Sequence, residues 1–286
     1  MQRPFRRASV ADHSMARPDF IEDDGAPTWI TRGANFVIAI TRARAGTRLA
    51  VSGVPDEHFV LLPDAGARIL LDGKATEIPA NHLLIVPPGN AELVAAGPGL
   101  VVRCFCARTR DLLARAGNAS AYADPCPQVA PIVDGPPPVG GFALKSYDLA
   151  AGLAEGDKTR VYRSSNLMIN ILRERHEARD PRGMSPHSHA DFEQGSITLR
   201  GLHVHHLRTP WVPDMSVWRP DEAVEVGCPS VTVIPPQIIH TTRNLGDGPA
   251  LLVDLFCPPR ADFMGRPGMV RNAAEYPLSP DFGDMP

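Results

Sequence analysis

Three histidines in the second half of the chain have the types and the spacing of metal ligands. His187 and His189 are one residue apart, and His240 lies much further along the chain, behind Pro235. On a β-strand, two residues separated by one other residue point to the same face, so the first two imidazoles would lie together. A third imidazole from a distant strand, with one oxygen ligand, suits a divalent ion such as Zn, Fe, Mn, Ni or Cu. The spacing therefore predicts a metal site.

Two neighbouring residues, Glu193 and Gln194, are the candidates for the oxygen ligand. They would point to opposite faces of a strand, so only one of them can join the histidines. A carboxylate would cancel one charge of a divalent ion. A glutamine oxygen is neutral, so the site would keep its positive charge and favour an anionic oxygen ligand.

Further polar residues lie on the strands predicted around this motif. Ser196 and Thr198 share the phase of Gln194, and we expect them to bind substrate hydroxyl groups or each other. On the following strand, His203 and His205 share one face, and a neutral histidine near a Lewis-acid metal can serve as a general base. Arg173 either holds a substrate carboxylate or forms a surface ion pair.

Composition places the chain among ordinary globular proteins. It has 286 residues, 43% hydrophobic and 21% charged, with a net charge of -3 and a pI of about 6.4. No overall basic field is present to hold nucleic acid or an anionic membrane, and no apolar run approaches the roughly 18–20 residues needed to span a bilayer. We therefore expect a small-molecule substrate, with neither nucleic acid nor membrane as partner.

The N-terminus and the cysteines indicate a cytoplasmic protein. The first twenty residues contain arginines but no apolar core segment, which argues against a secretory signal. The five cysteines form no disulfide-like framework, and Cys104 and Cys106 alternate on an apolar strand. They are interpreted as small buried hydrophobic residues in a reducing compartment.

Thirty prolines and 24 glycines among short β-branched runs predict many short strands and turns. The clearest helix is predicted at 109–116, and one of the predicted strands spans 161–175. The domain prediction is a flexible tail at 1–25, a β-domain at 26–117, a Pro/Gly-rich linker at 118–142, a metal-binding β-domain at 143–257 and a wrapping tail at 258–286.

The two halves contain a weak internal repeat. Leu83–Val86 runs into Pro87-Pro88, and Val231–Ile234 runs into Pro235-Pro236; a polar residue follows four positions after the second proline, Glu92 in one half and His240 in the other. Such repetition indicates duplication of one β-unit. Only the second copy carries metal-type side chains.

These motifs resemble those of the cupins, which are small double-sheet barrels of the jelly-roll kind. The first cupin motif matches His187, His189, Gln194 and the closing Gly201; the second matches Pro235, His240 and Asn244, with Gln237 where the family has glycine. The match covers roughly residues 160–257. In the first half only the second motif and the strand rhythm are similar, so the chain looks like a bicupin with a degenerate N-terminal domain.

The resemblance implies an all-β fold of two tandem barrels, as a monomer or a homodimer. It favours Gln194 as the fourth ligand, because some cupins that act on uronate sugars use glutamine there, and it places His203 and His205 in the pocket. It implies a divalent Fe, Mn, Zn or Ni ion and an isomerase or lyase acting on a small, oxygen-rich, anionic metabolite. Alternatives are a non-haem iron dioxygenase and a non-catalytic metal or small-molecule binding protein.

Overall fold

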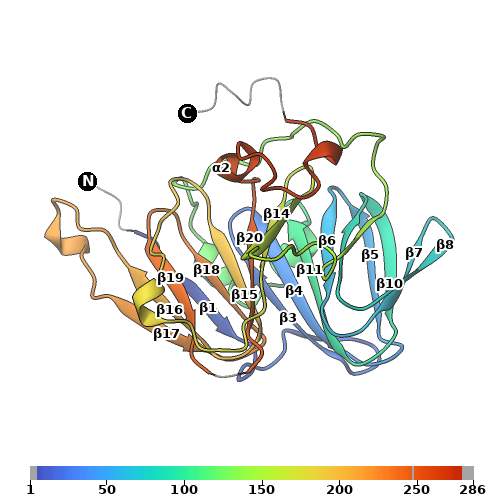
Figure 1. The fold of residues 1–286 in the computed structure, drawn as a ribbon, viewed down its shortest axis with the longest axis horizontal. Helices are drawn as coiled ribbons and strands as arrows, with labels where there is room; N and C mark the ends of the chain where they lie inside the picture. Colours follow the sequence, from blue (N-terminus) through green and yellow to red (C-terminus); the bar gives the residue numbers. More distant parts are fainter. Residues whose placement is uncertain (1–4, 247, 279–286) are drawn as a thin grey trace.

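The computed structural model describes residues 5–246 and 248–278. Most of its regular elements are β-strands, and they form two β-sandwich halves that lie side by side (Figure 1). Each half pairs one large sheet with one small sheet. The expectation of an all-β fold with two tandem jelly-roll domains is confirmed.

The first half contains a seven-stranded and a four-stranded sheet, all pairings antiparallel. In sheet order, the large sheet consists of β12 (Lys145–Asp148), β9 (His82–Val86), β6 (His58–Leu62), β11 (Gly99–Cys106), β4 (Phe36–Ala43), β3 (Pro27–Arg32) and β2 (Phe20–Ile21). The small sheet consists of β5 (Arg48–Val54), β10 (Gly89–Ala95), β7 (Ala67–Leu71) and β8 (Lys74–Ile78).

The second half contains a six-stranded and a three-stranded sheet, again antiparallel. The large sheet consists of β1 (Ser9–Asp12), β18 (Ser230–Ile234), β15 (Gln194–Arg200), β20 (Leu251–Phe256), β14 (Met168–Leu172) and β13 (Thr159–Arg163). The small sheet consists of β17 (Glu222–Val226), β16 (His203–Arg208) and β19 (Ile239–Asn244).

Helices are few and short. The helix predicted at 109–116 is α1 (Arg110–Ala114), and α2 (Ala261–Met264) follows β20; 3₁₀ turns lie at Ala119–Tyr122, Pro181–Gly183, Met215–Val217 and Ala273–Glu275. Among the described residues no helix has the length and apolar character needed to cross a membrane.

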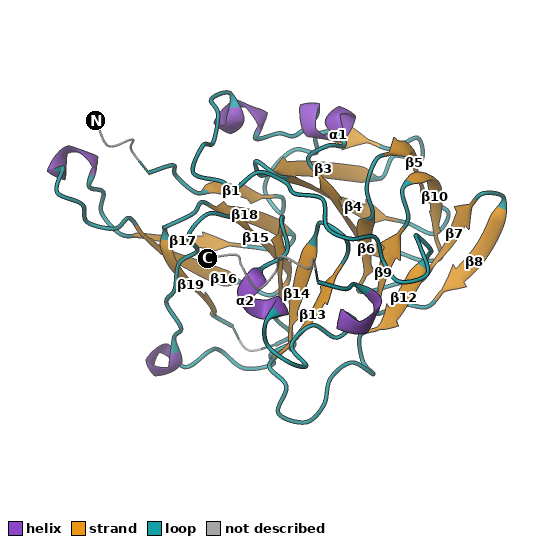
Figure 2. Ribbon diagram, turned by 90° about the horizontal axis from the view of Figure 1, so that it is seen from above, coloured by secondary structure: helices purple, strands orange, loops and turns teal. Residues whose placement is uncertain are grey.

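The halves exchange edge strands, which changes two of the predicted domain boundaries. β1 precedes the first half in sequence but pairs with β18 of the second half, and β12 precedes the second half but pairs with β9 of the first (Figure 2). The described part of the predicted flexible tail is therefore built into a sheet, and residues 145–148 of the predicted second domain belong to the first. Without these partners, β18 and β9 would expose unpaired backbone N–H and C=O groups at the sheet edges, and β1 and β12 form hydrogen bonds with these groups.

The strand predicted at 161–175 is two strands, β13 and β14. The Ser164 N–H donates to the Leu167 carbonyl, and Ser165 and Asn166 form the turn between them. Serine and asparagine favour turns because their side chains compete with the sheet for backbone hydrogen bonds.

The core of the molecule lies between the halves. One apolar cluster combines alternate residues of the first large sheet, such as Ile38 and Leu61, with alternate residues of the second, such as Ile197 and Val253. Gly195 lies at this contact, where an added Cβ would meet Phe36 and Ile38 at 3.0 Å. Since successive side chains of a strand alternate between faces, the other residues of each large sheet point into its own barrel.

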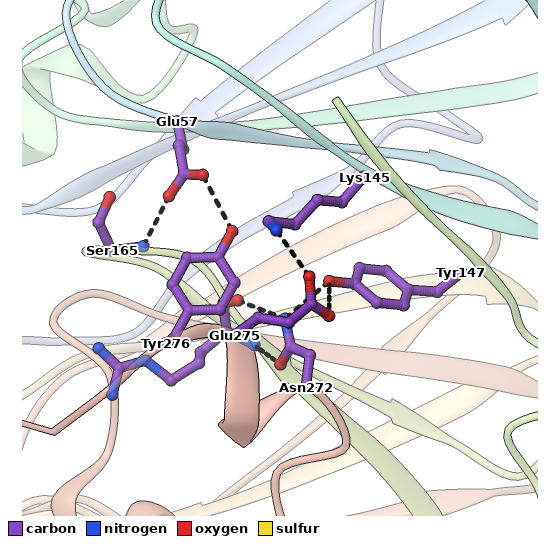
Figure 3. Close-up of polar contacts among 8 residues, drawn as sticks. Glu57, Lys145, Tyr147, Ser165, Asn272, Glu275 and Tyr276 are labelled. Carbon is purple, nitrogen blue, oxygen red and sulfur yellow. Dashed lines mark hydrogen bonds and ion pairs between the residues drawn. The ribbon is translucent and has the colours of Figure 1, made fainter. Parts of the chain in front are cut away.

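The described part of the predicted wrapping segment 258–286 is fastened to the first half; residues 279–286 lie outside the described part. Figure 3 shows Tyr276 pointing toward the buried Glu57: its hydroxyl donates to Oε1 at 2.9 Å, and the Ser165 N–H donates to Oε2 at 2.9 Å. Nearby, the Lys145 ammonium and the Tyr147 hydroxyl donate to Glu275 at 2.6 and 2.8 Å.

Candidate metal centre

Backbone pairing brings the two histidine motifs together. His187 and His240 form an isolated antiparallel bridge in which each N–H donates to the other's carbonyl, at 3.1 and 2.8 Å. His189 lies two residues after His187, and its carbonyl accepts the Gln237 N–H at 2.6 Å. The ligand nitrogens of the three histidines lie within 4.8 Å of one another, so the cluster could hold a metal ion.

The turn before His240 shows why the second cupin motif has glycine at the position of Gln237. Gln237 has φ +67°, in the left-handed region that glycine enters most easily. Its counterpart in the first half, Gly89, also has a positive φ, +116°. The turn keeps this conformation although the residue is no longer glycine.

Hydrogen bonds at the far side of two rings prepare them to bind a metal. Nδ1 of His187 lies 3.0 Å from the Ser185 carbonyl, and Nδ1 of His240 lies 2.9 Å from the Ile238 carbonyl. A carbonyl only accepts, so each Nδ1 carries the proton and each Nε2 keeps its lone pair. His189 and His240 are buried, whereas His187 is exposed and opens the cluster to solvent.

Gln194 is the neighbouring residue whose oxygen faces the histidines. Its Oε1 lies 2.9 Å from Nε2 of His189 and 3.3 Å from Nε2 of His240. Two adjacent ligands of an ion bound at 2.0–2.2 Å lie about 3 Å apart. The residues therefore fit a divalent ion held by three imidazoles and one amide oxygen.

Glu193 points the other way, into the contact between the halves. Its carboxylate accepts the Ala34 N–H at 2.5 Å and the Tyr122 hydroxyl at 3.0 Å. Burial raises the pKa of this carboxyl. It joins the two halves and does not face the cluster.

A buried carboxylate, Asp254, fixes the orientation of Gln194. Oδ1 of Asp254 accepts the Gln194 amide at 2.9 Å and the Ser196 hydroxyl at 2.7 Å, which leaves the Gln194 oxygen for the histidines. Burial raises the pKa of Asp254, and the Ser196 hydrogen bond opposes this. Sequence reasoning missed this residue, although an acid within the apolar run of β20 was the available signal.

The other predicted pocket residues divide into two groups. All four residues Ser196, Thr198, His203 and His205 are buried in the second half. Ser196 and Thr198 lie on the face of the large sheet turned away from the core between the halves, and His203 and His205 share the face of the small sheet that carries His240. Arg173 is not near the cluster: it follows the end of β14 opposite the one that pairs beside Gln194, and its exposed guanidinium donates to the carbonyls of Asp157 and Ala154, both at 2.6 Å.

Several polar atoms on this inner face have no hydrogen-bond partner among the described residues. Nδ1 of His205 lies 2.9 Å from the Thr242 hydroxyl, but its Nε2 is unpartnered. The other such atoms are Nδ1 of His203, the hydroxyls of Thr198, Ser230 and Thr232, and Oδ1 of Asn244. Buried polar groups normally have partners, so this interior is suited to water or a polar ligand.

A second residue that sequence reasoning missed is Arg260. It lies just beyond the end of β20, with its guanidinium 4.9 Å from the ring centroid of Phe256. The Phe256 ring in turn lies 5.8 Å from that of His189. No sequence motif singles out this arginine.

The fold is that of the cupins. AerE from Microcystis aeruginosa has a TM-score of 0.54 at 8% identity, covering 90% of this chain and 99% of that one. A single-residue mutant of Bacillus subtilis oxalate decarboxylase OxdC has a TM-score of 0.58 at 14% identity, covering 96% and 85%. Ylba from E. coli has a TM-score of 0.57 at 13% identity, covering 90% and 93%. No protein-family model matches the sequence, and neither does any curated protein.

Proposed function

We propose that this protein is a metal-dependent enzyme of the cupin fold that acts on a small, oxygen-rich, anionic metabolite in an isomerase or lyase reaction. The observation that carries the proposal is the donor set: three histidines, with the Gln194 oxygen turned toward them by Asp254. Such a set suits one divalent Fe, Mn, Zn or Ni ion.

When bound, the ion would act as a Lewis acid toward a carbonyl, hydroxyl or carboxylate oxygen of the substrate. His187, His189, Gln194 and His240 would hold it, and all four are neutral donors. The only carboxylate hydrogen-bonded to this set, among the described residues, is Asp254, which contacts the Gln194 amide. The centre therefore keeps enough positive charge to favour an anionic substrate.

His205 is the candidate for proton transfer. Burial lowers its pKa to about 3, so the ring is neutral near pH 7. In the tautomer in which Nδ1–H donates to the Thr242 hydroxyl, Nε2 presents a lone pair to the interior. An anionic substrate beside the ring would raise its pKa and make it a better base. Burial similarly lowers the pKa of His203 to about 4.

Hydroxyl groups on the inner face would bind the substrate. The hydroxyls of Thr198, Ser230 and Thr232 are buried and unpartnered, so each can donate to one substrate oxygen and accept from another. Ser196 has a different role, because its hydroxyl is engaged by Asp254. Oxalate decarboxylase, one protein of similar fold, acts by its name on a small dicarboxylate, which supports the anionic class.

An iron-dependent dioxygenase is the second candidate. Three neutral imidazoles also suit O₂ chemistry at Fe(II), and the exposed His187 leaves the cluster accessible from solvent. A demand for iron together with O₂ uptake separates the two candidates.

The first test is the metal content, by mass spectrometry, of protein purified without a histidine tag. The wild type should contain near-stoichiometric metal and His240→Ala should lose it. His206→Ala should retain it, since His206 is exposed on the neighbouring strand. Asp254→Ala should bind metal roughly tenfold or more weakly, because the amide of Gln194 is no longer held.

The identity of the metal directs the activity screens. Iron would lead to O₂-consumption assays with diols and aromatic acids; zinc, manganese or nickel would lead to isomerase and lyase assays with keto and uronic acids. Absence of metal in the wild type, even after reconstitution, would contradict the proposal and favour a non-catalytic binding protein.

A further inference from the structure

Arg260 lies in an aromatic cage that contacts the histidine cluster. Its guanidinium carbon is 3.8 Å from the ring centroid of Phe263, 4.9 Å from that of Phe256 and 5.6 Å from that of Phe192. The Phe192 ring stacks on His189 with centroids 4.5 Å apart. A single layer of rings therefore connects this cation to a candidate metal ligand.

The Arg260 guanidinium has N–H groups that donate to no described residue. Asp262 accepts from Nε at 3.0 Å and from Nη2 at 2.8 Å. Guanidinium carries five N–H donors, and within residues 5–246 and 248–278 no other acceptor takes one of them. The two hydrogens of Nη1 and one of Nη2 remain, and this pair of nitrogens matches the two oxygens of a carboxylate.

The charge of Arg260 lies one layer of aromatic rings away from the cluster. Its side chain is only 11% exposed, so water screens its charge poorly. With a metal ion held at the cluster, an anion between Arg260 and that ion would meet positive charge on both sides.

The first half has no cation at the equivalent position. Cys106 ends β11 and Cys257 follows β20, and three residues later Thr109 and Arg260 take equivalent N-cap positions at the short helices α1 and α2. Figure 1 shows α2 above β20 and β14 of the second half. The arginine thus occurs only in the half that carries the histidine cluster.

We infer that Arg260 determines substrate specificity by binding a carboxylate of the substrate held at the histidine cluster. The inference rests on the proposed function and narrows it. The substrate would be a small carboxylic acid, with one carboxylate on Nη1 and Nη2 of Arg260 and a second oxygen directed to the cluster. A 2-oxo or 2-hydroxy acid has this arrangement of oxygens.

The test uses the full chain loaded with Co(II), whose visible absorption reports both metal binding and anion binding at the metal. The loaded protein is titrated with pyruvate and with oxalate, and in parallel with inorganic phosphate. In Arg260→Gln, Co(II) should still bind with the wild-type stoichiometry, while the Kd for pyruvate and oxalate rises roughly tenfold or more, as expected for the loss of a charge-assisted pair. Arg173→Gln is the matched control and should leave both affinities unchanged.

A second variant keeps the inference testable if Arg260→Gln fails to fold. Asp262→Asn removes the competing carboxylate and leaves Arg260 in place, so pyruvate should bind more tightly than to the wild type. The inference is overturned if pyruvate and oxalate bind equally well with and without Arg260, if they do not bind to the loaded wild type, or if phosphate is preferred over both. Failure of the wild type to bind Co(II) would instead overturn the proposed function, and the inference with it.

Discussion

The two halves of the molecule have the same strand arrangement but differ in the side chains of their barrel interiors. In each half the central strand pairs with equivalent neighbours: Val60 of β6 lies opposite Leu84 and Arg103, and Ser196 of β15 lies opposite Thr232 and Asp254. The interior of the first half is an apolar cluster that includes Val60, Leu62, Leu84 and Val86. The matching interior positions in the second half are Ser196, Thr198, Thr232 and Ile234.

The contact between the halves, by contrast, is nearly symmetric. Glu57 precedes the central strand β6 and accepts a turn N–H from Ser165 and the hydroxyl of Tyr276. Glu193 precedes β15 and accepts a turn N–H from Ala34 and the hydroxyl of Tyr122.

A matched pair of asparagines repeats this symmetry. Asn118 and Asn272 each exchange two hydrogen bonds with the backbone of an arginine, Arg32 and Arg163 respectively. The segment 107–122 is therefore the first-half counterpart of the described C-terminal segment. The comparison teaches that the contact between the halves constrains both copies alike, while the barrel interior is free to diverge toward packing or chemistry.

Lowering the pH should change the stability of the protein more than any of the substitutions below, because both halves bury neutral histidines. Burial lowers the pKa of His58 in the first half and of His205 in the second from 6.5 to about 3. Below pH 6.5 the unfolded chain takes up protons that the folded chain refuses, so metal-free protein should lose several kcal/mol of stability as the pH falls from 6.5 toward 3.

Denaturant unfolding between about pH 8 and pH 4 measures this loss. His58→Gln gives the first half the residue that the second half has at the equivalent position, Gln194. It should reduce the slope of the unfolding free energy against pH. The control His206→Gln, at an exposed position, should leave that slope unchanged. Equal slopes in wild type and His58→Gln would show that His58 titrates normally in the folded state.

Removing either of the two carboxylates at the contact between the halves should lower the free energy of unfolding by a similar amount. Glu57→Ala and Glu193→Ala each leave a buried N–H and a tyrosine hydroxyl without an acceptor, which should destabilise the protein by about 3 kcal/mol. Urea unfolding measures the loss, with the exposed Glu77→Ala as control. A cost for one variant and none for the other would contradict the symmetry of the contact.

Exchanging valine and threonine should have opposite consequences in the two interiors. Val60→Thr would bury an unpartnered hydroxyl in an apolar cluster and should cost about 1–3 kcal/mol. Thr198→Val removes a hydroxyl that already lacks a partner among the described residues and should be neutral or slightly stabilising. Thermal unfolding of both variants decides the matter, and a cost at Thr198 would indicate that a bound water or ligand satisfies its hydroxyl.

The smallest effect is expected at the turn that precedes the third histidine. Gln237→Gly relieves the left-handed backbone but frees the unfolded chain, so stability should change by less than about 1 kcal/mol and metal content should not change. The converse change, Gly89→Gln, forces a side chain into φ +116° and should cost more. Equal effects at both positions would contradict a difference in backbone strain between the two turns.

The sequence by itself determined the elements that depend on local pattern. Alternating apolar strands, the Pro-Pro repeat and the His187/His189 spacing predicted a duplicated β-unit and a histidine cluster in the second copy, because strand period and turn chemistry are local properties. That each copy is a jelly-roll barrel was implied by the resemblance to the cupins. The resemblance to the cupins added the place of Gln194 beside these histidines.

Only the tertiary structure decided which charged residues surround that cluster. Asp254 lies within an apolar strand, Arg173 follows one, and Arg260 follows Pro258-Pro259; nothing local shows which of them lies near His189. The exchange of β1 and β12 between the halves, and the turn of Glu193 toward Ala34, depend on partners at least 60 residues away along the chain. These contacts are strand pairings at the sheet edges and a hydrogen bond across the contact between the halves, and a local sequence pattern carries no information about them.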